Sequence, residues 1–164
     1  NIKYFDYKIL RDLNIIQHLD DYDIISKKIH NDYYEKNPDH TVKWEDIPET
    51  MKMSNRYQAY HTNIKLGYLG YVVDINSKAD KISITYSESQ LGVLAQMEKR
   101  RWNAERLLSG WIYGEEKHPD LKIHPDLVPW EKLDEIAKQK DRDTVSNITN
   151  TITALGFSLT KVDE

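Results

Sequence analysis

Apolar side chains recur at a helical spacing in the second half of the chain. They stand at positions 91, 94, 97, 104, 108 and 111, and steps of three and four residues are typical of an amphipathic helix. Ser87 and Gln90 form the Ser-x-x-Gln pattern of a capping box, which marks a helix start. Glycine often follows the last residue of a helix, as Gly110 would here. We therefore predict a helix from about 87 to 110.

A weaker pattern of the same kind opens the first half. Asp23 is a suitable N-cap residue, and it is followed at helical spacing by Ile24, Ile25, Ile29, Tyr33 and Tyr34. We predict a helix that begins at Asp23. An offset of 68 positions would set Tyr34 of this helix on Trp102 of the other one.

The two halves also share a longer pattern at a constant offset of 86 positions. The segment 44–71 aligns with 130–157 without a gap, and identical residues coincide at Trp44 and Trp130, Arg56 and Arg142, and Gly70 and Gly156. A register held over so many positions indicates an internal duplication.

Each copy ends in a glycine followed by a run that favours a strand, at 71–75 and 157–162. Glycine allows the left-handed conformation that often ends a helix before an extended segment. The predicted unit is therefore helix, loop, helix, strand, twice over, with a proline-rich loop at 114–129 in the second copy and a linker at 76–80. Further short strands are expected at 82–86 and 2–9.

Composition places the chain among folded globular proteins. Its 164 residues are 39% hydrophobic and 30% charged, with a net charge of -4, so nothing suggests a bulk attraction to nucleic acid. There is no cysteine, no signal-peptide pattern and no apolar run long enough to cross a bilayer. We expect a soluble cytoplasmic protein with no direct membrane insertion. Because the chain begins without Met, we also expect it to be part of a longer polypeptide.

Several short motifs resemble the RyR domain, the module named after ryanodine receptors. The resemblance covers residues from about 89 to 162, while 23–75 resembles a degenerate partner copy, and the pairing is of the bacterial type. The first copy lacks the Gly-Trp-x-Tyr-Gly motif. The motifs that carry the resemblance are Glu98-Lys-Arg-Arg-Trp102, Gly110-Trp-Ile-Tyr-Gly114, His124-Pro-Asp-Leu-Val128, Trp130, Asp141-Arg142 and Ala154-Leu-Gly-Phe157.

The resemblance implies a fold that is mainly α with small antiparallel β elements (α+β). It also implies two helix-loop-helix-strand repeats related by an approximate two-fold axis. We expect one compact unit over 1–164, with the degenerate repeat at 11–76 and the other repeat at 87–162. The family implies regulation or ligand sensing, with nucleotides as proposed ligands, and an effector domain fused or associated outside this chain.

An aromatic and arginine cluster is the candidate ligand site. Trp102 and Arg106 share one face of the predicted helix, and an indole beside a guanidinium suits the stacking of a base and the pairing of its phosphate. Tyr34, or the neighbouring Tyr33, would supply the opposite ring if the copies meet about the axis. The candidate ligand-binding residues are Tyr34, Arg56, Arg101, Trp102, Asn103, Arg106, Trp111, Tyr113 and Arg142.

Each of these residues also has a structural interpretation. Trp102 and Trp111 would be core anchors, while Arg101 and Arg106 would pair with the glutamates at 98 and 105 on a solvated face. Arg56 and Arg142 each follow an Asn or Asp, which suggests an N-cap and a structural salt bridge rather than phosphate binding. Trp44 and Trp130 are expected to pack at helix N-termini.

Catalytic and metal chemistry find little support in the sequence. His118 and His124, with acids nearby, have no regular metal-ligand spacing, so we expect no metal and no cofactor. No nucleophile elbow, Walker motif or Gly-x-Gly-x-x-Gly occurs. We therefore expect no enzyme, with a hydrolase or transferase acting on a nucleotide as a minor alternative.

Together these observations favour a non-enzymatic sensor. It would bind a nucleotide or nucleotide-derived small molecule of the adenine type in an aromatic and arginine cleft between the two repeats. The alternative is a protein-interaction or homo-oligomerisation module of a larger regulatory or transport protein, whose aromatic residues pack on another chain.

Overall fold

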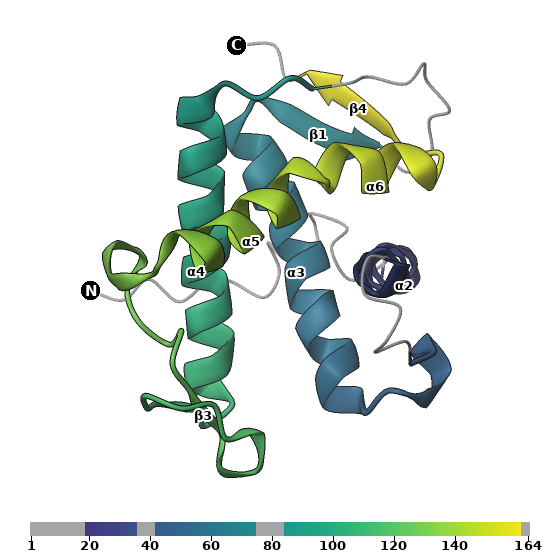
Figure 1. The fold of residues 1–164 in the computed structure, drawn as a ribbon. Helices are drawn as coiled ribbons and strands as arrows, with labels where there is room; N and C mark the ends of the chain where they lie inside the picture. Colours follow the sequence, from purple (N-terminus) through teal and green to yellow (C-terminus); the bar gives the residue numbers. More distant parts are fainter. Residues whose placement is uncertain (1–18, 36–41, 75–83, 162–164) are drawn as a thin grey trace, which may run out of the picture.

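The computed structural model describes residues 19–35, 42–74 and 84–161 (Figure 1). Helices dominate these residues, and strands form two small sheets. In chain order the elements are α2 (Leu19–Glu35), the 3-10 helix η2 (Trp44–Asp46), α3 (Glu49–Tyr68), β1 (Tyr71–Asp74), α4 (Glu88–Leu108), β2 (Ile112–Tyr113), η3 (Pro119–Leu121), β3 (Ile123–His124), η4 (Trp130–Lys132), α5 (Glu135–Ser146), α6 (Ile148–Ala154) and β4 (Ser158–Lys161).

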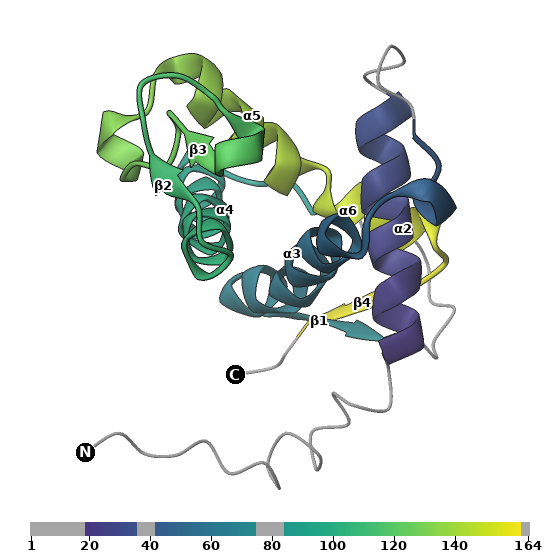
Figure 2. The ribbon, with the colours of Figure 1, turned by 90° about the horizontal axis from the view of Figure 1, so that it is seen from below.

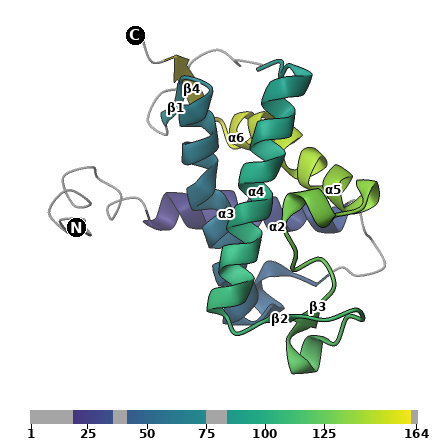
Figure 3. The ribbon, with the colours of Figure 1, turned by 90° about the vertical axis from the view of Figure 1, so that its left-hand side faces the viewer.

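Helix α3 lies at the centre of the arrangement. It packs against α2 on one side and against α4 on the other, while α5 lies along α4 and α6 contacts α2 (Figures 1 and 2). Strands β1 and β4 pair antiparallel, with Tyr71 opposite Lys161, and close one end of the molecule. Strands β2 and β3 lie near the opposite end of α4 (Figure 3). The predicted class, mainly α with small antiparallel β elements, is confirmed, although β2 and β3 pair in parallel.

Both halves end in a 3-10 helix, a helical segment and a strand, in that order. Trp44 opens η2 before α3 and β1, and Trp130 opens η4 before α5, α6 and β4. Gly70 and Gly156 follow these helices with φ angles of 78° and 77°. This left-handed conformation was predicted for both positions. It favours glycine because glycine has no Cβ atom to clash with the backbone.

Local signals placed α4 correctly. The Ser87 hydroxyl accepts a hydrogen bond from the Gln90 backbone, and the Gln90 side chain accepts one from the Ser87 backbone, so both halves of the capping box form. The helix ends at Leu108, and Gly110 follows it with a φ of 82°. The helix of the first half begins at Leu19 instead of Asp23. Asp23 is therefore not its N-cap.

Some predicted elements differ or lie outside the described residues. Residues 84–87 form no strand. The predicted loop 114–129 contains a 3-10 turn and β3, which pairs with β2 and gives the segment more order than its prolines suggested. The predicted strand at 2–9 and linker at 76–80 lie outside the described residues.

The core lies where α2, α3, α4 and the α5–α6 pair meet. Burying a side chain such as Leu or Ile contributes about 1.5–3 kcal/mol, so this junction fixes how the helices pack. None of the described helices combines the length and the apolar character needed to cross a bilayer. The buried core residues are Ile25, Ala59, Leu66, Leu94, Ala95, Val145, Ile148, Ile152 and Leu159.

Candidate functional site

A groove of about 660 Å³ runs between α3 and α4. Its volume falls within the range of roughly 300–1,000 Å³ that is usual for small-molecule sites. We call it the α3–α4 groove. Helix α3 contributes Tyr57, Tyr60, His61 and Ile64, and the residues of α4 used below are Met97, Arg100, Arg101, Glu105 and Leu108.

Helical spacing explains why these side chains meet. Positions 57, 60, 61 and 64 of α3 lie three or four residues apart, so they share one face of the helix. Positions 97, 100, 101, 105 and 108 form the matching stripe on α4. Because α3 packs against α4, the two stripes face each other across the groove.

Much of the groove surface is apolar and exposed to solvent. The exposed fraction is 46% for Tyr57, 57% for Ile64 and 90% for Leu108. Exposed apolar side chains that lie together, rather than singly, mark binding surfaces. Tyr60 is more enclosed than Tyr57, and burial raises its pKa. The groove therefore offers flat and aliphatic surface to an apolar ring.

One arginine of the groove is available to a ligand and the neighbouring one is committed. Arg101 is held by Glu98 and Glu105, with N–O distances of 2.7 Å and 2.9 Å and a side chain that is only 8% exposed. Arg100 is exposed and, among the described residues, joins no ion pair. Within the described part of the chain, Arg100 is thus the arginine of the groove whose positive charge is free to pair with a ligand.

His61 contributes a neutral ring to the wall of the groove. Burial, followed by the charge of Lys65, lowers the pKa of His61 to about 4, so the imidazole carries no charge at neutral pH. Its Nδ1 is buried and has no hydrogen-bond partner within the described part of the chain. A buried polar atom without a partner is uncommon in folded proteins.

An ionic network joins α3 to α4 beside the groove. The Arg101 guanidinium donates to both Glu98 and Glu105, and Glu105 also accepts a hydrogen bond of 3.0 Å from the Ser54 hydroxyl of α3. Burial alone would raise the pKa of Glu98, but Lys65 and Arg101 together hold it below its usual value. These bonds fix α4 against α3 and so define the width of the groove.

The predicted tryptophan cluster lies on another face of α4. The Arg106 guanidinium carbon is 5.5 Å from the ring centre of Trp102 and 4.8 Å from that of Trp111. Lys99 Nζ lies 4.3 Å from the centre of the Trp102 ring, and the ring of His124 meets the same indole at 5.0 Å. Side chains of the protein itself therefore occupy the surroundings of Trp102.

This cluster anchors the segment that follows β3. Asn103 Nδ2 donates a 2.9 Å hydrogen bond to the carbonyl oxygen of Val128, and Lys99 Nζ donates to that of Asp126. The Oδ1 atom of Asn103 and the Nε atom of Arg106 are buried without partners in the described part of the chain. Tyr113 of β2 is 56% exposed. Trp102 and Trp111 thus pack against side chains of the protein itself, as the structural interpretation of these residues expected.

The remaining predicted arginines form ion pairs far from the tryptophan cluster. Arg56 binds Asp23 of α2 through Nε and also pairs with Glu49, while Arg142 pairs with Glu135 at 3.3 Å. Both arginines lie well inside their helices. The expected helix start beside each was wrong, because both helices begin at least one turn earlier. The expected salt bridges are present.

Tyr34 does not face Trp102. It lies near the end of α2, where its ring contacts those of His30 and Tyr33. Helices α2 and α4 lie on opposite sides of α3 (Figure 2). The expected sandwich of a base between Tyr34 and Trp102 is therefore wrong. Of the nine predicted residues, Arg101 alone lines the α3–α4 groove.

Sequence reasoning missed Tyr57, Tyr60, His61 and Arg100. The spacing of the three α3 residues is visible in the sequence and places two tyrosines and a histidine on one helix face. The predicted site was instead based on the motifs of the second copy, because those motifs contain Trp102 and Trp111. Only the packing of α3 on α4 reveals that this face is opposite Arg100.

His118 and His124 were the residues considered as metal ligands. Among them, no three His, Asp or Glu side chains gather closely enough to hold a metal ion. His124 instead packs against Trp102 and accepts a hydrogen bond from the backbone of Asp126, while His118 lies 3.6 Å from Glu116.

The comparison with known families gives one match. The model of the RyR domain matches residues 80–161, which is half of the chain and includes α4, α5, α6 and β4. Helix α4, one wall of the groove, lies inside the match, and α3, the other wall, precedes it. The chain belongs to the RyR domain family.

Proposed function

We propose that this chain is a non-enzymatic regulatory module that binds a nucleotide, or a nucleotide-derived small molecule of the adenine type, in the α3–α4 groove. One observation carries the proposal: the groove brings the rings of Tyr57 and Tyr60 to the same cavity as the guanidinium of Arg100, which joins no ion pair among the described residues. An aromatic surface beside a free cation matches a molecule that has a flat ring at one end and a phosphate at the other.

The base would lie against the apolar part of the groove. Stacking of a base on an aromatic side chain contributes about 1–3 kcal/mol, and Tyr57 is exposed enough to offer one face of its ring. Ile64 and Met97 would cover the rest of the ring. Such a site selects the ring by shape and burial rather than by a large number of hydrogen bonds.

The phosphate would bind Arg100. A guanidinium presents two parallel N–H groups to a phosphate, and a hydrogen bond to a charged group contributes roughly 1.5–3 kcal/mol. Arg100 can bind a phosphate because it forms no ion pair among the described residues. Arg101 cannot, because it already pairs with Glu98 and Glu105. Because His61 is neutral, it adds no positive charge to that of Arg100.

The chemistry of the groove supports binding rather than catalysis. Glu105 is the carboxylate of its lining, and it already accepts from Arg101 and from the Ser54 hydroxyl. A general base must reach the proton that it removes, and a carboxylate held by two protein donors is poorly placed for that. His61 turns its Nδ1 away from solvent.

We further propose that residues 11–76 are a degenerate RyR-like repeat that pairs with the repeat at 87–162, as in bacterial tandem pairs. The repeated order of elements and the matching left-handed glycines support this pairing. A binding site whose two walls come from different repeats would sense how the repeats pack. The output would pass to an effector domain, fused or associated, outside this cytoplasmic module.

A second candidate function is protein interaction or homo-oligomerisation. It is favoured by exposed apolar residues at the end of α4 and in β2, where Leu107, Leu108 and Ile112 are 60%, 90% and 58% exposed. Light scattering over a range of concentrations separates the two functions. A mass that stays that of a monomer, together with nucleotide binding, favours the sensor.

Calorimetry with a panel of mono-, di- and cyclic nucleotides and ADP-ribose tests the proposal. We expect at least one of them to bind, and Tyr57→Ala and Arg100→Ala to weaken its binding about tenfold or more. Lys117→Ala, a change of an exposed cation in another part of the second repeat, is the matched control and should leave the affinity unchanged. No binding by any member of the panel, or equal binding by all variants, contradicts the proposal.

A further inference from the structure

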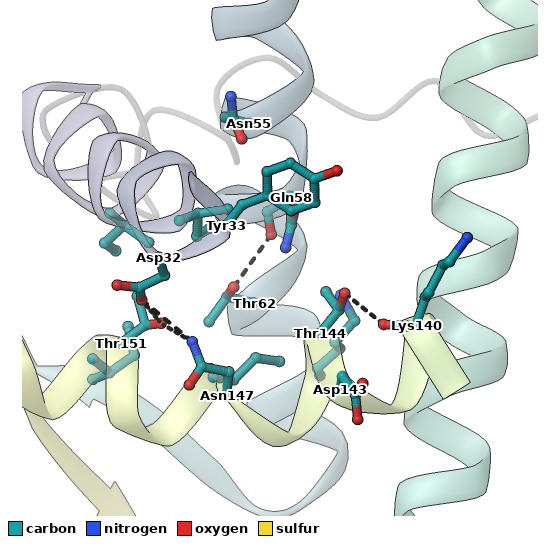
Figure 4. A pocket seen from close by; sticks show the side chains of 15 residues that line it. Asp32, Tyr33, Asn55, Gln58, Thr62, Lys140, Asp143, Thr144, Asn147 and Thr151 are labelled. Carbon is teal, nitrogen blue, oxygen red and sulfur yellow. Dashed lines mark hydrogen bonds between the residues drawn. The ribbon is translucent and has the colours of Figure 1, made fainter. Parts of the chain in front are cut away.

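A second cavity lies where α2, α3 and the α5–α6 pair meet (Figure 4). Its volume is about 520 Å³, which again falls within the range of small-molecule sites, roughly 300–1,000 Å³. We call it the α2–α6 cavity. It shares α3 with the α3–α4 groove but uses a different helix face, because positions 55, 58, 62 and 65 line it instead of 57, 60, 61 and 64.

The floor of the cavity is aliphatic. Ile25 of α2 and Ile148 and Ile152 of α6 are at least nine-tenths buried and belong to the core of the protein. A rigid branched surface of this kind accepts the face of a flat ring and gives no hydrogen bonds to it. The polar recognition must therefore come from the walls.

The walls of the cavity carry uncharged polar side chains as well as charged ones. Asn147 is committed to the protein, since its Nδ2 donates to Asp32 and to Thr151 at 3.3 Å each. The side-chain amide of Gln58, in contrast, has no hydrogen-bond partner within the described part of the chain. Figure 4 draws it among the side chains that line the cavity, which also include Tyr33. Gln58 is thus a donor and an acceptor available to a ligand.

Charge in the cavity does not favour an anion. Lys65 is neutralised by Glu98, whose Oε2 lies 2.5 Å from its Nζ. The amine of Lys140 extends away from Gln58 in Figure 4. The carboxylates of Asp32 and Asp143 both line the cavity. A phosphate would meet the Asp143 carboxylate and that of Asp32, which Lys28 already pairs, and among the described residues no unpaired cation directed at it.

We propose that the α2–α6 cavity binds an uncharged planar heterocycle of the nucleobase or nucleoside class. The Gln58 amide would pair with adjacent donor and acceptor atoms on the edge of the ring, as glutamine does with adenine in nucleic-acid recognition. Tyr33, 60% exposed, would cover one face, and the isoleucine floor would hold the other. This site takes a ligand without phosphate, whereas the α3–α4 groove takes one with it.

Calorimetric titration of the full chain with adenosine, guanosine, cytidine and uridine tests this inference. We expect one nucleoside to bind, Gln58→Leu to weaken it at least tenfold, and the exposed control Lys117→Ala to leave it unchanged. Gln58→Glu keeps the length of the side chain and adds a charge, so it should weaken binding even if the leucine variant folds poorly. The unfolding temperature of each variant verifies that it is folded.

The outcomes separate the two sites. Failure of all four nucleosides to bind, or unchanged binding by both Gln58 variants, overturns the inference. Loss of nucleoside binding in Tyr57→Ala with full binding in Gln58→Glu would place the nucleoside in the α3–α4 groove and also overturn it. The corresponding 5′-monophosphate should bind the cavity more weakly than the nucleoside, and tighter binding that depends on Gln58 contradicts the charge argument.

Discussion

Lys65 Nζ lies 2.5 Å from Glu98 Oε2, and this ion pair joins α3 to α4 with side chains that are only 1% and 4% exposed. Glu98 also receives the guanidinium of Arg101 at 2.7 Å. The pair therefore lies between the two cavities, since Lys65 lines one and Arg101 lines the other. It fixes the contact between the halves on which both proposed sites depend.

Removing one partner of this pair should destabilise the protein strongly. Lys65→Met leaves the buried carboxylates of Glu98 and Glu105 to share the guanidinium of Arg101, and removing one partner of a buried ion pair costs about 3–5 kcal/mol. Urea denaturation measures the loss as a change in the free energy of unfolding. Lys27→Met is the control, because the pair of Lys27 with Glu45 is exposed and such pairs contribute about 0–1 kcal/mol. Equal effects of the two substitutions would contradict the role given to the buried pair.

Asp141 should make stability depend on pH in an unusual direction. Burial and the nearby charge of Glu98 raise the pKa of Asp141 to about 6, against the opposing charges of Lys99, Arg101 and Lys65. The ordinary pKa of an aspartate is 3.8, and the unfolded chain releases this proton near that value, so the folded state binds more protons between pH 3.8 and about 6. The contribution of Asp141 to stability therefore falls as pH rises from about 4 to about 6.

The variant Asp141→Asn isolates this effect. Its unfolding temperature should exceed that of the unmodified protein above pH 6, and the advantage should shrink as the pH falls towards 4. Thermal unfolding followed by circular dichroism at several pH values measures the difference. A difference that is constant over this range would show that Asp141 does not titrate in this way.

Gly114 should not tolerate a side chain. A Cβ at this position would lie 2.4 Å from Cγ2 of Ile123, so alanine would push β2 away from β3. Overpacking of this kind costs about 1–3 kcal/mol. Gly92→Ala is the matched control, because a Cβ there meets nothing within 4 Å, and alanine in a helix interior stabilises by roughly 0.5–1 kcal/mol. The two alanine variants should thus shift the unfolding temperature in opposite directions.

Trp102→Ala distinguishes packing from ligand binding. The indole is enclosed by Lys99, Arg106 and His124, so its loss should destabilise the protein by about 3 kcal/mol. It should leave nucleotide affinity within about twofold when measured well below the unfolding temperature. A stable Trp102→Ala protein that no longer binds nucleotide would return the site to the tryptophan cluster.

Local signals in the sequence predicted the elements well. The capping box at Ser87 and the glycines at 70, 110 and 156 act on their own helix ends, and each was found where it was expected. Asp23 resembled an N-cap in the same way, but it pairs with Arg56 of α3. A partner 33 positions away leaves no local signal in the chain.

The candidate site was harder to predict because it depends on packing between helices. The sequence suggested that Arg101, Glu98 and Glu105 lie on a solvated face. In the structure they are buried, and Lys65 of α3 pairs with Glu98. Tyr34 and Trp102 hold similar places in the two halves, yet α3 separates their helices. The α3–α4 groove also places aromatic rings and arginines together, but Tyr57 and Arg100 of this groove were not among the predicted residues.

A crystal structure of the protein with the tightest-binding nucleotide of the panel tests the central claim most directly. We predict electron density for the base against Tyr57 and Tyr60 and for a phosphate within hydrogen-bond distance of Arg100. Density for the nucleotide beside Trp102 and Trp111 instead, with the α3–α4 groove empty, would contradict the account.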